Sequence, residues 1–139
     1  ARGRFLEHAV VHGSLYGTPR NDVEELLEEG KNVLLAIDVK GAEQVRSDPA
    51  TASRLTSIFL VPPDEATLER RLAGRGTEDS AEVGLRLQTA RQEMRERDKY
   101  DHVVVNQDLA QTVAEVHQIV EDKSCSPTGC RTKAQHKDS

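Results

Sequence analysis

The sequence is poor in aromatic residues, cysteine and long apolar runs. It has no Trp, two Phe, two Tyr and two Cys among 139 residues. No apolar run approaches the roughly 20 residues needed to span a bilayer, and no basic, apolar and small-residue leader opens the chain. We therefore expect a cytoplasmic protein without a membrane partner. Cys125 and Cys130 are too few for a four-ligand zinc site, and we assign no metal ligands.

The charge balance is acidic. The chain carries 24 acidic and 19 basic residues, which gives a formal net charge of -5. Proteins that bind nucleic acid normally carry an excess of basic residues. We therefore expect that this protein does not bind nucleic acid. An anionic ligand would have to be held by a local cluster of Arg or Lys. The length fits one domain.

Three short apolar runs alternate with helical patterns, which predicts an α/β fold. The runs cover residues 33–39, 57–61 and 102–106. The first is almost continuously apolar, as a strand covered on both faces should be. Strands separated by helices favour right-handed crossovers and a parallel sheet flanked by helices. Ligands of such sheets bind beyond the carboxyl ends of the strands, where Asp38 and Asn106 stand.

Local signals set the expected helix ends. Thr18 is expected to cap a first helix with Pro19 in its first turn, and Gly30 should end that helix. Residues 123–139 are too polar to bury apolar area, which predicts a disordered tail. Three later helices are expected to start at Asp64, Asp79 and Asp108. The last of them should carry one apolar stripe of Leu109, Val113, Val116 and Val120.

Arginines cluster around a glycine break between two helical patterns. Arg71 and Arg75 are one turn apart and share a helix face, Gly76 follows, and Arg86 lies on the next helix. Residues 67–97 therefore suit a mobile helical lid that closes its arginines over a polyphosphate. The alternative is a solvated charged face, since nearby glutamates supply partners.

A second group of polar residues lies near the start of the chain. Glu7 falls in an alternating, strand-like stretch, and Tyr16 and Thr18 flank a glycine just before a helix N-terminus. Such a terminus attracts anions. A carboxylate, a phenol and a hydroxyl would then converge on a ligand with a donor edge and a phosphate. The alternative is an ordinary strand, loop and helix.

Five segments in order give the sequence a resemblance to guanylate kinase. The resemblance runs from about Phe5 to Val120, and each motif by itself is short. The segments are Phe5-Leu6-Glu7, Tyr16-Gly17-Thr18, Ile37-Asp38-Val39-Lys40-Gly41-Ala42, Arg71-Leu72-Ala73-Gly74-Arg75-Gly76-Thr77 and Val104-Val105-Asn106.

The resemblance implies a P-loop kinase fold and an enzyme of purine metabolism that moves the γ-phosphoryl of ATP to GMP with Mg²⁺. Residues 1–122 would form the domain, with 1–32 as part of the GMP-binding region. Glu7 and Thr18 would recognise guanine, Tyr16 the GMP phosphate, and Asp38 would lie near GMP. The lid arginines Arg71, Arg75 and Arg86 would act on the phosphates, and Arg71, Arg75 and Asn106 would bind ATP.

The family's phosphate loop, G-x-x-x-x-G-K-S/T, is not found in these 139 residues. We therefore expect an N-terminally incomplete guanylate kinase that is inactive by itself. A second hypothesis is a non-catalytic guanylate kinase-like module whose pocket binds a phosphorylated protein segment. The lid arginines argue against the module, because it needs no ATP lid.

Overall fold

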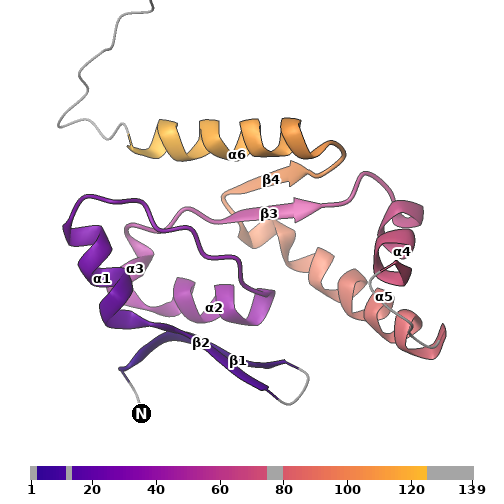
Figure 1. The fold of residues 1–139 in the computed structure, drawn as a ribbon, viewed down its shortest axis with the longest axis horizontal. Coiled ribbons are helices and arrows are strands. Elements are labelled where there is room, and N and C mark those ends of the chain that lie inside the picture. Colours follow the sequence, from indigo (N-terminus) through magenta and orange to yellow (C-terminus); the bar gives the residue numbers. More distant parts are fainter. Residues whose placement is uncertain (1–2, 12–13, 75–79, 125–139) are drawn as a thin grey trace, which may run out of the picture.

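The computed structural model describes residues 3–11, 14–74 and 80–124, which form two separate sheets and their helices (Figure 1). The first sheet is an antiparallel hairpin of β1 (Phe5–Val11) and β2 (Ser14–Pro19). The second is a parallel pair of β3 (Ile58–Val61) and β4 (His102–Val105), in which Ile58 lies opposite His102. The second sheet confirms two of the three predicted parallel strands.

The hairpin packs with three helices around a small apolar core. These helices are α1 (Arg20–Glu28), α2 (Val39–Ser47) and the short α3 (Pro49–Ala52). Leu6, Val23 and Val45 are buried at the centre of this core. We call β1, β2, α1, α2 and α3 the hairpin unit.

The remaining helices accompany the parallel strands. Helix α4 (Glu65–Ala73) packs against α5 (Ser80–Met94), which continues into the 3₁₀ helix η1 (Arg95–Lys99). Helix α6 (Leu109–Ser124) packs along β4 (Figure 1). Because α6 extends to Ser124, the first two residues of the predicted tail are helical. The rest of that tail, with Cys125 and Cys130, lies outside the described residues.

The predicted strand at residues 33–39 is wrong. Residues 31–38 have no strand partner among the described residues, and Val39 already begins α2. Val33, Leu35 and Ile37 pack on the core of the hairpin unit, whereas Leu34 is 77% exposed. The segment therefore alternates in burial as an extended chain does. A β-strand also requires hydrogen bonds to a neighbouring strand, and the residue pattern of one run cannot show whether such a neighbour exists.

The first helix ends as predicted but begins differently. Gly30 has φ 77°, its N–H donates to the Leu27 carbonyl, and the N–H of Lys31 donates to the Leu26 carbonyl. This is the double hydrogen bond of a Schellman ending. At the other end Pro19 is the cap and Arg20 the first helical residue. Thr18 is not the cap, because its hydroxyl is engaged across the hairpin.

Two of the other predicted helix starts are confirmed, and the third lies outside the described residues. The Asp64 carboxylate accepts from the Thr67 N–H at 2.6 Å, and that of Asp108 accepts from the Gln111 N–H at 3.3 Å. Asp79 lies in the undescribed stretch. The predicted stripe of α6 is only half right, because Leu109 is 73% and Val113 59% exposed. Thr112 in the same turns is buried, so the covered face of α6 at its start is that of Thr112 and not that of Leu109 and Val113.

A reciprocal contact joins the starts of β3 and β4. The Ser57 main-chain N–H and hydroxyl donate to Asp101 Oδ2 at 2.8 and 2.9 Å, and the Asp101 N–H donates to Ser57 Oγ at 3.0 Å. The Ser57 backbone N–H is the main reason why the pKa of Asp101 lies below its ordinary value. The ionised carboxylate therefore holds the two strands in register.

This contact predicts a pH-dependent loss of stability in Asp101→Asn. Stability from a lowered carboxyl pKa is present above the ordinary value of 3.8 and is lost as the pH falls through the folded value. We expect Asp101→Asn to lower the urea midpoint at neutral pH, and we expect this deficit to be smaller at about pH 3, below the ordinary value of 3.8. Asp98→Asn is the control, since the Asp98 side chain is 90% exposed. An equal deficit at both pH values would contradict the prediction.

Candidate functional site

A buried carboxylate lies at the centre of the candidate site. Glu7 is only 6% exposed and stands opposite Thr18 in the hairpin register. The Thr18 hydroxyl donates to Glu7 Oε1 at 2.5 Å, which fixes the orientation of the carboxylate. A buried ionisable group needs partners to offset desolvation. Oε1 has such a partner in Thr18, and Oε2 faces helix α2.

Helix α2 brings Asp38 to the same place. Asp38 caps this helix, and its Oδ1 accepts from the Gly41 N–H at 2.7 Å. A Cβ on Gly41 would lie 2.9 Å from Glu7 Oε2 and 3.2 Å from Asp38 Oδ1. The two carboxylates therefore approach Gly41 closely, and only glycine leaves room for both. Three of the four residues predicted for GMP are thus gathered: Glu7, Thr18 and Asp38.

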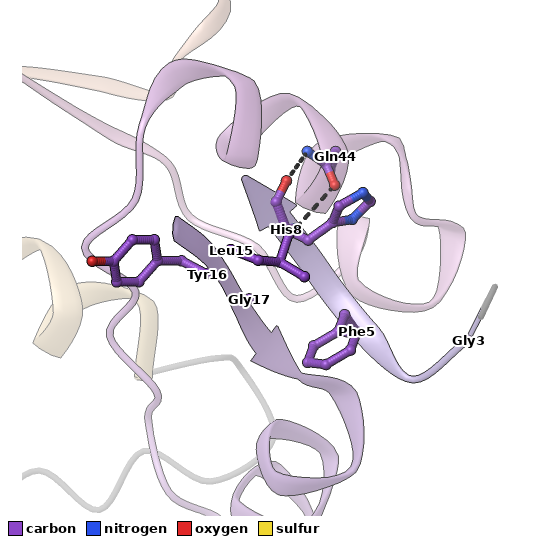
Figure 2. A pocket seen from close by; sticks show the side chains of 7 residues that line it. All are labelled: Gly3, Phe5, His8, Leu15, Tyr16, Gly17 and Gln44. Carbon is purple, nitrogen blue, oxygen red and sulfur yellow. Dashed lines mark hydrogen bonds between the residues drawn. The ribbon is translucent and has the colours of Figure 1, made fainter. Parts of the chain in front are cut away.

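A glutamine side chain holds α2 against the hairpin. Gln44 Nε2 donates to the His8 carbonyl at 2.9 Å, and the His8 N–H donates to Gln44 Oε1 at 3.1 Å (Figure 2). This amide pairs with the free edge of β1 as a neighbouring strand would. Residue types and spacing gave no indication of this role, because it depends on a contact across 36 residues.

Tyr16 lies on the same hairpin face as the carboxylate. It pairs with Ala9, two positions from the pair of Glu7 with Thr18, so alternation places these side chains on one face. Figure 2 shows its ring directed away from Phe5 and His8. Tyr16 is 60% exposed, so its hydroxyl is open to a ligand.

A groove opens on the hairpin beside the candidate site. Its lining includes Phe5, His8, Leu15, Tyr16 and Gly17, but none of the three gathered residues (Figure 2). A Cβ on Gly17 would lie 2.9 Å from the Phe5 ring, so this glycine allows the ring to lie flat on β2. The groove therefore adjoins the candidate site at Tyr16.

Two of the residues predicted for ATP also meet. Arg71 Nη2 in α4 donates to the Asn106 carbonyl at 2.9 Å, just beyond β4. The Asn106 N–H donates to the Val61 carbonyl at 2.7 Å, and its side-chain oxygen accepts from the Thr112 hydroxyl at 3.2 Å. The exposed Arg71 guanidinium is thereby held at the carboxyl ends of the parallel strands.

The other two arginines predicted for the lid are Arg86 and Arg75. Arg86 forms an ion pair with Glu82 at 3.4 Å, one turn away on α5. Arg75, with the Gly76 break, lies outside the described residues. The structure does not bring Arg86 to Arg71 through any described contact, so its lid role stays a prediction.

Glu93 of α5 is a residue that the sequence reasoning missed. Burial raises its pKa, the charge of Asp38 raises it further, and Lys40 opposes the shift. Helix α5 thus places an acidic side chain within electrostatic range of the α2 cap. Helical spacing along α5 cannot show which element Glu93 faces.

Comparisons with known proteins agree with one another. The family model described as guanylate kinase matches residues 1–123. The guanylate kinase of Leifsonia xyli is 50% identical over 117 residues, which is 84% of this chain and 45% of that protein. The guanylate kinase of Symbiobacterium thermophilum is 46% identical over 120 residues, or 86% of this chain and 56% of that protein.

A solved structure supports the same relationship. The crystal structure of guanylate kinase from Anaplasma phagocytophilum superposes with a TM-score of 0.73 at 30% sequence identity. It covers 90% of this chain, and the chain covers 58% of it. The chain therefore spans about half the length of the relatives that it matches. By the family match and these likenesses, the chain belongs to the guanylate kinase family.

Proposed function

We propose that this chain supplies the guanine-recognising part of an enzyme that phosphorylates GMP with ATP to give GDP. The observation that carries the proposal is the buried Glu7 carboxylate, oriented by Thr18 and brought close to Asp38 at Gly41. Guanine presents two adjacent donors, its N1–H and its exocyclic amine. A fixed carboxylate accepts from both, and adenine does not offer this pattern.

The remaining contacts belong to the same proposal. Tyr16, on the same face as Thr18, would donate its hydroxyl to the GMP phosphate. Arg71, held by the Asn106 carbonyl, would stabilise charge on the ATP phosphates. The reaction then depends on positioning and electrostatic stabilisation and needs no acid–base triad.

Mg²⁺ would be bound mainly by ATP. The described part of the chain contains no group of three or more His, Cys, Asp or Glu side chains arranged for a metal ion. Magnesium in kinases is usually held by substrate phosphates, water and one or two carboxylates. We therefore assign the ion to the complete enzyme with ATP and derive no step through these residues.

Among the described residues, no helix is long and apolar enough to cross a membrane. A cytoplasmic location stays a prediction. The alternative of a non-catalytic binding module is kept as an outcome of the experiment below.

Calorimetric titration of the 139-residue chain tests the proposal. We expect GMP to bind and AMP to bind at least about 100-fold more weakly, because a site built for donors rejects a ligand that lacks them. Equal affinity for GMP and AMP would overturn the proposal. Binding of a phosphorylated peptide in preference to GMP would instead favour the module.

Gly41→Ala is expected to lower GMP affinity about tenfold, or about 1.4 kcal/mol. The new methyl would lie 2.9 Å from Glu7 Oε2, so the carboxylate must move. Gly84→Ala on α5 is the matched control, because nothing lies within 4 Å of its added Cβ. Titration of both variants checks the prediction, and unchanged affinity in Gly41→Ala would contradict it. Alanine favours a helix over glycine, so unfolding of the variant is not the expected cause of a loss.

A further inference from the structure

Three parts of the molecule meet at Tyr100. This residue follows η1, and its ring lies edge-on to Phe59 of β3, with centroids 4.9 Å apart and planes at 74°. The Arg46 guanidinium of α2 lies over the same ring, 4.8 Å from its centroid. One side chain therefore contacts the hairpin unit and the parallel sheet, and it stands at the end of the α5–η1 segment.

The guanidinium is held in this position by its surroundings. Arg46 Nη1 pairs with Glu43 at 3.0 Å on the same helix. Nη2 is buried and has no hydrogen-bond partner among the described residues, so contact with the ring offsets part of its desolvation. Lysine keeps the charge but lacks the planar face that stacks on an aromatic ring.

Charges show that the stretch from Glu93 to Tyr100 lies near α2. Glu93 lies within electrostatic range of Asp38 and Lys40 near the start of α2. Lys99 pairs with Glu96 and also lies within electrostatic range of Glu43. Further along, Arg46 reaches Tyr100. The end of α5 and the 3₁₀ helix η1 therefore lie near α2, whereas α5 itself packs against α4.

Helix α2 is in turn fixed to the hairpin. Gln44 pairs with His8, and Gly41 lies against Glu7. A displacement of α2 at Arg46 would therefore carry the candidate guanine site with it. Asn106 follows β4, which pairs with the strand that Phe59 occupies, so the ATP side is joined to the Tyr100 ring through Phe59.

We propose that Arg46, stacked on Tyr100, is a positioning residue that sets the hairpin unit relative to the parallel sheet and to the α5–η1 segment. It touches no predicted substrate group and acts through the ring. Its consequence for phosphoryl transfer, the alignment of GMP with ATP, rests on the proposed function. The geometric effect itself does not.

Distances between spin labels in the 139-residue chain test this role without nucleotide. One label at Glu28 on α1 is paired with a second at Ala114 on α6 or at Gln88 on α5, all exposed positions. Cys125 and Cys130, the only cysteines, are changed to Ser in every sample. Circular dichroism confirms that each variant is folded.

For each label pair we expect a single narrow distribution of distances in the parent. The distribution should be about twofold wider or more in Arg46→Lys, Arg46→Ala and Tyr100→Leu. Tyr100→Phe keeps the ring and should stay narrow. Arg54→Lys is the matched control, because Arg54 is exposed beside α3. If the alanine and leucine variants fail to fold, the test rests on Arg46→Lys. Its distribution is then compared with those of Arg54→Lys and Tyr100→Phe.

The outcomes separate the two proposals. A narrow distribution in folded Arg46→Lys would overturn the positioning role, whatever the chain binds. Titration with GMP in the same samples should give affinities within about threefold of the parent, because Arg46 lies away from Glu7 and Thr18. A parent that does not bind GMP would overturn the proposed function and leave the distance result standing.

Discussion

Replacement of Glu7 by Gln is expected to weaken GMP binding by the chain about 100-fold, or about 3 kcal/mol. Thr18 already donates its hydroxyl to Oε1. A glutamine that turns its oxygen to Thr18 must present its amide N–H₂ to the two donors of guanine. Two donors would then face each other in a position that is only 6% exposed, where water cannot easily satisfy them.

Calorimetric titration with GMP and AMP measures this loss. Glu69→Gln is the matched control, since Glu69 is an exposed carboxylate on α4. We expect the control to bind as the parent does, and the preference for GMP over AMP to collapse in Glu7→Gln. A change of less than about threefold in GMP affinity would show that Glu7 does not contact the base.

The second large effect is an absence of turnover. The purified 139-residue chain is expected to form no GDP from GMP and ATP above a reaction without protein. Phosphoryl transfer needs a cradle for the β- and γ-phosphates, which the family builds from a glycine-rich loop with Lys and Ser/Thr. That motif does not occur in the 139 residues. Detection of GDP in a coupled assay or by chromatography checks the prediction.

A joined protein provides the positive control. Placing a phosphate-loop segment of the family ahead of Ala1 should give activity, and Arg71→Ala in that protein should lower kcat about 100-fold or more. Arg54→Ala, outside the site, should leave it unchanged. GDP formation by the chain alone that disappears in Arg71→Ala would contradict the expected inactivity. Formation that persists in Arg71→Ala would indicate a contaminating kinase.

Predictions that rest on short-range chemistry are confirmed by the structure. A left-handed residue must follow the end of a helix that turns sharply, and Gly30 adopts it at φ 77°. Asp64 caps α4 through an N–H three residues away. The runs at β3 and β4 are correctly identified because β-branched and apolar residues suit a strand in many surroundings.

The structure corrects two predictions that depended on a partner distant in the sequence. The run at residues 33–39 has the composition of a strand, but no described strand lies beside it. Thr18 had a cap sequence, yet its hydroxyl bonds to Glu7, eleven residues away, and Pro19 takes the cap. Local propensity gave way in both cases to the arrangement of the chain in space.

The sequence by itself determined the family, the strand and helix order of most of the chain, and the residue types of the candidate site. Only the tertiary structure decided that Gly41 lets two carboxylates approach, that Gln44 pairs with the edge of β1, and that Arg46 stacks on Tyr100. Spacing along a chain reports which residues share a face of one element. It carries no information on which face of another element they meet, because that is set by packing between segments far apart in sequence.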